Sequence, residues 1–143
     1  MKISEDLFNF NVKKTLTRDQ MDDILTTAIE GGIGYWACLL NDDPAWIKAE
    51  KQQKAEGGLL YWSSVALRVM ENGDAVKFVD AEEDPDDPDL EVWKLTLDKL
   101  MQGCALFEQE RGSITKMLND GSFDAIEADC LIQYAVFGKI IFG

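Results

Sequence analysis

Apolar and small residues recur at helical spacing over residues 21–39, the longest periodic segment of the chain. They are Met21, Ile24, Leu25, Ala28, Gly32, Tyr35, Trp36 and Leu39. This spacing indicates one face of a helix. The glycines at positions 31, 32 and 34 interrupt it, and each costs about 1 kcal/mol in a helix interior. The apolar register passes through them without a slip, so we predict a continuous helix to Leu40. A helix that ends at a glycine cap at Gly31 and Gly32 is the alternative.

The N-terminal segment shows strand periodicity. Phe8, Phe10 and Val12 alternate with Asn9, Asn11 and Lys13, which predicts a half-buried strand within residues 7–16. Thr17 followed by Gln20 forms a capping-box pattern, and it predicts the start of the first helix.

The middle of the chain predicts a polar helix and a hairpin. Asp43 as N-cap and Pro44 at the first helical position indicate a helix over about 44–55 on the surface, ended by Gly57 and Gly58. Residues 59–70 fit a strand or a helix. Asn72-Gly73 is a preferred pair for a two-residue hairpin turn, so we predict strands over 59–70 and 75–79. A third strand follows at 90–95.

The last third of the chain predicts three helices. Thr96 caps a helix that ends before Gly112, residues 114–118 form a short helix, and Asp124 with Glu127 starts a helix closed by Gly138. Residues 140–142 are predicted as a short strand. The whole chain, 1–143, is therefore expected to be a single α+β domain, with a small antiparallel sheet of three to four strands packed by several helices.

Charge and composition limit the possible functions. The net charge is −13, from 27 acids and 14 bases, and it repels phosphate backbones, so we expect no direct nucleic-acid binding. No apolar run reaches the ~18 residues of a membrane span, and residues 1–6 lack the features of a signal peptide. The odd count of three cysteines predicts reduced, buried thiols in the cytoplasm.

The absence of histidine excludes Ser-His and Cys-His nucleophile systems and histidine metal sites. No other catalytic pattern is evident. We therefore expect a protein that is not an enzyme, with no cofactor and no metal.

Residues 80–91 hold eight acids in twelve positions, with Pro85 and Pro88 between them. The composition is typical of a solvated loop. Calcium binding is one alternative, but the segment lacks the central glycine and the closing glutamate of an EF-hand. The other is a docking surface for a basic partner protein. Its candidate residues are Glu82, Glu83, Asp84, Asp86, Asp87 and Asp89.

The glycine-rich stretch is a second candidate site. Its residues are Glu30, Gly31, Gly32, Gly34, Tyr35 and Trp36. Aromatic residues at helical spacing are usually core, but glycines also let a ligand approach the backbone closely. Nearby in sequence, Trp46, Tyr61 and Trp62 form a binding patch if exposed and belong to the core if buried.

Three markers give the chain a resemblance to a family of small, uncharacterised proteins encoded in bacteriophage and prophage genomes. The first spans 22–25 and 28–36 and includes the E-G-G-I-x-Y-W stretch at 30–36. The second spans 80–83 and 94–99. The third spans 128–130 and the Q-Y-A-x-F-G motif at 133–138, with Gly143. The resemblance implies a phage or prophage origin. We hence expect an accessory protein that binds a host factor, as a defence inhibitor or a nucleic-acid mimic. The alternative is a binder of a small nucleotide-like molecule at the glycine-rich stretch.

Overall fold

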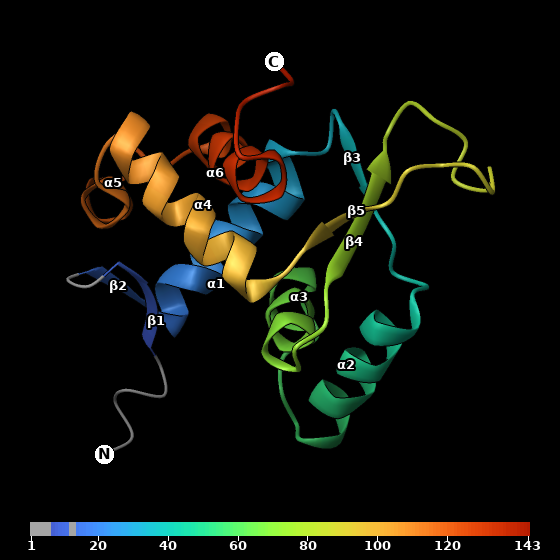
Figure 1. Cartoon of the computed structure of the whole chain (residues 1–143). Coiled ribbons are helices and arrows are strands. Elements are labelled where there is room, and N and C mark those ends of the chain that lie inside the picture. Colours follow the sequence, from blue (N-terminus) through green and yellow to red (C-terminus); the bar gives the residue numbers. More distant parts are fainter. Residues whose placement is uncertain (1–6, 12–13) are drawn as a thin grey trace.

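The computed structural model of the protein describes residues 7–11 and 14–143, and it has the predicted α+β architecture (Figure 1). Predictions for Val12, Lys13 and residues 1–6 lie outside the described residues. The strands are β1 (Leu7–Asn11), β2 (Lys14–Thr17), β3 (Ala37–Leu39), β4 (Val76–Asp80) and β5 (Trp93–Leu95). The helices are α1 (Arg18–Thr27), the π-helix η2 (Ala28–Gly32), α2 (Pro44–Ala55), α3 (Trp62–Glu71), α4 (Leu97–Glu110), α5 (Ile114–Asp120) and α6 (Ala125–Phe137).

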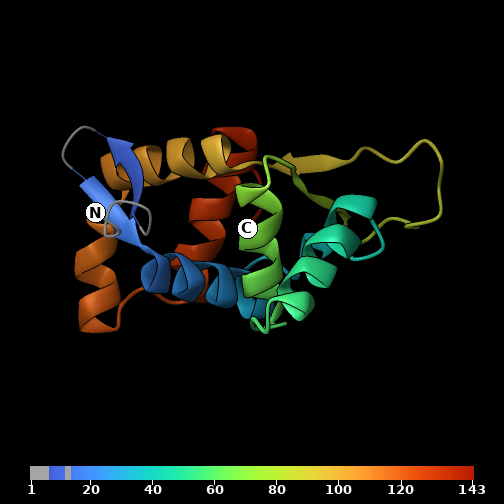
Figure 2. The same ribbon diagram turned by 90° about the horizontal axis from the view of Figure 1, so that it is seen from below.

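The strands form two small sheets instead of the one predicted. β1 and β2 pair antiparallel, with Leu7 opposite Thr17. The second sheet has the order β3-β4-β5, again antiparallel, with Cys38 opposite Val79 and Lys77 opposite Lys94. The β1–β2 hairpin and the connection between β4 and β5 lie at opposite ends of the molecule in both views (Figure 1, Figure 2).

Helices α4 and α6 pack closely in the core. A Cβ atom at Gly103 of α4 would lie 2.6 Å from the Cβ of Ala135 on α6, so only glycine permits this helix separation. Cys104 and Phe107 on α4 and Leu131 on α6 are completely buried beside this contact. The core therefore depends on a helix pair whose spacing is set by one missing side chain.

The prediction of a continuous helix to Leu40 is wrong. α1 continues only into the π-turn of η2, and the chain then turns and enters β3. Ile33 and Trp36 in the turn are still buried, at 3% and 2% exposure. The turn and the helix bury residues against the same core, so apolar residues keep a helical spacing through both. Periodicity alone therefore does not distinguish a helix from this turn.

The strand predicted at 59–70 is also wrong, because residues 62–71 form α3. Val65, Ala66, Val69 and Met70 are buried on one helical face. Asn72-Gly73 ends this helix instead of forming a hairpin turn: Gly73 has φ +87°, and the Asp74 amide donates to the Val69 carbonyl at 3.1 Å. Asn-Gly meets the need for a positive φ equally well after a helix or between strands.

Most predicted helix boundaries are confirmed. Thr17 and Gln20 form a complete capping box, and Asp43, Thr96 and Asp124 are N-caps as predicted. At Asp124 only half of the box forms, because the Glu127 carboxylate binds Arg111. The pairing of β4 with β5 is confirmed. Residues 140–142 pair with no described strand, which corrects the predicted terminal strand.

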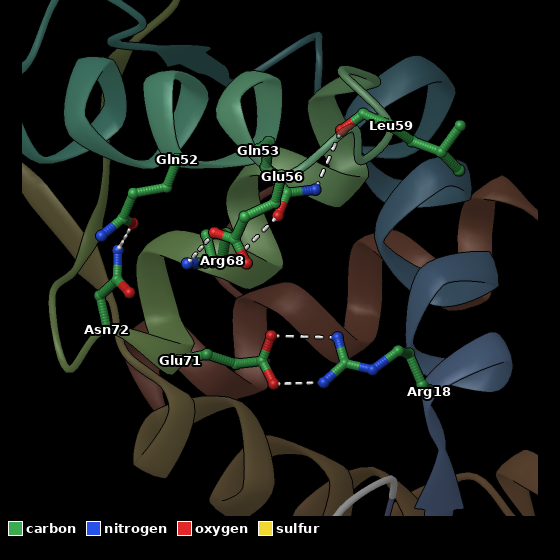
Figure 3. A network of polar contacts seen from close by, with 8 residues as sticks. All are labelled: Arg18, Gln52, Gln53, Glu56, Leu59, Arg68, Glu71 and Asn72. Atoms are coloured by element: carbon green, nitrogen blue, oxygen red, sulfur yellow. Dashed lines mark hydrogen bonds and ion pairs between the residues drawn. The ribbon is translucent and has the colours of Figure 1, made fainter.

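Polar contacts hold α2 against α3 (Figure 3). Arg68 of α3 donates to Gln53 at 3.3 Å and to Glu56 at 2.6 Å, and Asn72 donates to Gln52 at 2.6 Å. Arg18 of α1 forms a bidentate ion pair with Glu71 of α3. α2 also buries Trp46 and Ala49, so this mostly polar helix is fixed at the surface by a short apolar stripe and a set of side-chain hydrogen bonds.

The three cysteines differ in accessibility, which corrects the expectation that all are buried. Cys104 and Cys130 are buried, whereas Cys38 on β3 is exposed. Burial raises the pKa of Cys104 to about 12 and also raises the pKa of Cys130. The thiolate is the reactive form of cysteine.

We therefore expect iodoacetamide to modify Cys38 in the folded protein and to leave Cys104 and Cys130 unmodified until the chain unfolds. Mass spectrometry of tryptic peptides after timed quenching measures this. Equal rates at the three positions in native buffer would contradict the packing described here.

Candidate functional site

The glycine-rich stretch packs against the beginning of α6. A Cβ atom at Gly32 would lie 2.8 Å from the Ala125 carbonyl oxygen and 3.2 Å from the Asp129 amide nitrogen. Gly32 therefore has to be glycine for η2 to approach α6. Gly31 meets only the Ala125 Cβ at 3.9 Å, and at Gly34 a Cβ would meet nothing within 4 Å. Of the three glycines, one has a packing role.

Asp129 of α6 joins the turn after η2 to the core. Its side chain accepts hydrogen bonds from the Tyr35 hydroxyl at 2.6 Å and from the Trp36 indole Nε1 at 2.7 Å. Gln133, one helical turn further along α6, donates to the same carboxylate at 2.9 Å. Asp129 is only 8% exposed. Three neutral donors thus stabilise a carboxylate that burial alone would destabilise.

Gln133 also holds the segment after α6. Its Oε1 accepts from the amides of Ile141 and Phe142, both at 2.8 Å, and its Nε2 donates to the Phe142 carbonyl at 3.2 Å. The side-chain amide thereby takes the place of a neighbouring strand. This explains how residues 140–142 keep a fixed position without a sheet partner.

Four aromatic rings pack together beneath this segment. The Phe142 ring stacks on Trp36 with centroids 5.0 Å apart and an interplanar angle of 8°. The rings of Trp93 of β5 and Phe137 of α6 lie 5.4 to 5.9 Å from these two rings, centroid to centroid, and 5.2 Å from each other. Trp36 is therefore a core residue that fixes the turn, the sheet and the C-terminal segment to one another.

An open groove of about 830 Å³ lies between η2, α6 and residues 140–143. Its lining residues are Gly31, Gly32, Tyr35, Ala125, Ile126, Asp129, Cys130, Ile140, Phe142 and Gly143. Most of them are apolar, and Asp129 supplies the one charged side chain among them. We call this feature the α6 groove.

The α6 groove brings together part of the predicted site. Gly31, Gly32 and Tyr35 line it, whereas Trp36 is buried behind it, and Glu30 and Gly34 are exposed but outside the lining. Sequence reasoning missed Asp129, Ile126 and the contribution of Phe142. One face of the predicted helix carries residues at i, i+3, i+4 and i+7 spacing, namely Ile126, Asp129, Cys130 and Gln133. This mixed polar and apolar face was the feature of the sequence from which the site could have been predicted.

The aromatic patch expected around α2 is divided between core and surface. Trp46 is 4% exposed and packs edge-on against Trp62 at 5.9 Å. Trp62 is 46% exposed and Tyr61 is 63% exposed. Leu59 and Leu60 beside them are also exposed. The connection from α2 to α3 and the first residue of α3 therefore present apolar side chains at the surface, whereas Trp46, which contacts Trp62, is buried.

The acidic arm, residues 80–91, extends away from the rest of the chain between β4 and β5 (Figure 1, Figure 2). Three aspartates stabilise its turns: Asp80, Asp84 and Asp87 each accept from the amide two residues later, at 2.9 to 3.0 Å. Residues 81–89 are exposed. None of the ion pairs between described residues involves a carboxylate of the arm.

Within the described ranges, no group of three or more His, Cys, Asp or Glu side chains is placed to hold a metal ion. The described helices include none with the length and apolar character needed to cross a membrane. The surface features available for recognition include the α6 groove, the acidic arm and the exposed apolar residues 59–62.

We expect Gly32→Ala to lower the free energy of unfolding by about 1–3 kcal/mol, because the new methyl group meets backbone that would have to shift. Gly34→Ala is the matched control, and it should leave stability unchanged or raise it by up to about 1 kcal/mol, since its Cβ meets open space. Urea denaturation measures both. Equal stability of the two variants would show that Gly32 does not set the distance between η2 and α6.

Partial burial of the Tyr35 hydroxyl and its hydrogen bond to Asp129 raise the pKa of this side chain from 10.0 to about 12, although half of the residue is exposed. The neutral phenol is therefore favoured in the folded protein, and its contribution to stability is complete below pH 10 and lost as the pH rises toward about 12. We expect the stability difference between wild type and Tyr35→Phe to decrease across this interval. Tyr61→Phe controls for the loss of a hydroxyl. A difference that stays constant with pH would contradict the Tyr35–Asp129 contact.

No family model, no curated protein and no solved structure matches this chain. The resemblance to the phage- and prophage-encoded family stays a prediction from the three sequence markers. Inference about function therefore depends on the geometry of the α6 groove and the acidic arm.

Proposed function

We propose that this protein acts by binding another protein, with the acidic arm docking on a basic surface of the partner. The observation that carries the proposal is the exposure of the arm: its carboxylates extend from the fold and form no ion pair with described residues. The family resemblance adds that the partner is a bacterial host factor, such as a defence component or a protein that binds nucleic acid.

The local geometry of the arm favours docking. The three aspartate turns restrain the backbone, so less conformational entropy is lost on binding than with an unrestrained loop. Eight like charges close together attract a basic surface over a Debye length of about 8 Å at physiological salt. Such a surface mainly raises the association rate.

The two other functions expected from the sequence receive less support. A mimic of double-stranded nucleic acid needs carboxylates in rows over an extended face, and here the dense acidic run is one connecting segment. A nucleotide-like ligand needs cationic or backbone donors for its phosphates, and none of the described residues that line the α6 groove is lysine or arginine.

The test replaces five acids of the arm by their amides. The variant carries Glu82→Gln, Glu83→Gln, Asp84→Asn, Asp86→Asn and Asp87→Asn. Asparagine keeps the Oδ1 that accepts the turn hydrogen bonds of Asp84 and Asp87, so the fold should be retained. We expect partner capture from a bacterial host lysate at low salt to be lost in this variant.

The control removes the same number of charges elsewhere on the exposed surface. It carries Asp23→Asn, Asp42→Asn, Glu50→Gln, Asp98→Asn and Glu110→Gln. Quantitative mass spectrometry of the captured proteins compares both variants with wild type. If the arm variant captured the same partners as wild type, the arm would be a solvated loop. If both variants lost capture equally, net charge rather than the arm would be responsible.

A further inference from the structure

The α6 groove exposes two isoleucine side chains and the ring of Tyr35. Ile126 is 67% exposed, Tyr35 is 52% exposed and Ile140 is 41% exposed. Large apolar residues gathered around a concave surface mark interaction sites in soluble proteins. Exposure of this kind costs solubility and contributes nothing to the core, so a ligand that covers these side chains would gain their burial.

Asp129 is the one charged side chain that lines the α6 groove, and no lining residue is lysine or arginine, although Lys139 precedes the lining residue Ile140 in the chain. The Asp129 carboxylate is hydrogen-bonded by a phenol, an indole and an amide, all neutral. No ion pair between described residues involves Asp129. Glu30 on η2 and the N-cap Asp124 at the start of α6 flank the same region. The groove therefore combines an apolar surface with a carboxylate that forms no ion pair with a described residue.

We propose that the α6 groove binds an arginine or lysine side chain flanked by apolar residues, supplied by an extended segment of the partner. The cation would lie against the Tyr35 ring and near the Asp129 carboxylate, while the flanking apolar residues would cover Ile126 and Ile140. A cation over a tyrosine face is attracted by the negative charge density of the ring. The proposal rests on the proposed function only in taking the basic side chain from the partner.

The first experiment compares two peptides that differ in charge alone. The probes are acetyl-Leu-Arg-Leu-amide and the same peptide with citrulline, the uncharged counterpart of arginine. Because the Trp36 indole N–H donates to Asp129, its ¹H–¹⁵N resonance reports on the groove during titration. We expect the arginine peptide to shift this resonance and to bind about tenfold more tightly than the citrulline peptide, the ratio that about 1.4 kcal/mol produces.

Equal binding of the two peptides would overturn the cation site and leave an apolar groove. Absence of any shift of the Trp36 resonance at millimolar peptide would overturn the proposal altogether.

The second experiment changes the charge at the edge of the groove. Ile126 precedes Asp129 by three residues on α6, so a lysine at 126 can reach the carboxylate and compete with the peptide. We expect Ile126→Lys to weaken arginine-peptide binding at least tenfold and Ile126→Glu to retain it. Ile47→Lys on α2 is the control for net charge, since Ile47 is also exposed, at 38%. Equal losses in Ile126→Lys and Ile126→Glu would contradict a cation site.

The proposed docking by the arm and the proposed cation site in the α6 groove can be refuted independently of each other. The arm variant should still bind the arginine peptide, because the acidic arm contributes no residue to the α6 groove. Loss of partner capture in Ile126→Lys with normal capture in the arm variant would overturn the proposed docking by the arm and support the groove. Normal capture in Ile126→Lys would overturn the groove as the place where the partner inserts a basic side chain.

Discussion

The hydrogen bonds to the Asp129 carboxylate are the constraint on which the rest of this structure depends. A buried carboxylate without partners costs several kcal/mol, and three donors compensate for that cost here. Two of the donors come from Tyr35 and Trp36, so the turn after η2 is fixed on α6. The third, Gln133, binds the segment that carries Phe142. One side chain thereby couples three parts of the chain that are distant in sequence.

The hydrogen bonds of Asp129 and Gln133 determine the shape of the surface around these two residues. Trp36 packs within the aromatic cluster. The neighbouring residue Tyr35 therefore points outward, is half exposed, and donates its hydroxyl hydrogen to Asp129. Because Gln133 fixes the backbone of residues 141 and 142, Ile140, Phe142 and Gly143 form one wall of the α6 groove instead of filling it. The groove exists as a consequence of how the core is closed, and its acidic, apolar character follows from the residues used to close it.

The acidic arm has a different physical basis. It carries no core residue, and its conformation comes from local turns in which an aspartate accepts from the amide two residues later. The arm begins where β4 ends. β4 pairs with β3, and β3 is the strand that follows the turn containing Trp36. The sheet therefore sets the position of the arm relative to the body, while the arm itself contributes charge. In the proposed function, a basic partner would be attracted over a long range by the arm and contacted at short range by the groove.

The sequence by itself determined the α+β class, the helix starts and the exposure of the acidic arm, because capping residues, prolines and dense like charge act through neighbours in the chain. It did not determine where α1 ends or that residues 62–71 are helical. Gly32 and Asn72-Gly73 are compatible with two local structures each, and the choice was made by packing against α6 and by the burial of Val65 and Val69. The sequence predicted only part of the α6 groove, namely Gly31, Gly32 and Tyr35. The role of Asp129 was not visible, because its partners Tyr35 and Trp36 lie more than ninety residues away along the chain and only the tertiary structure brings them together.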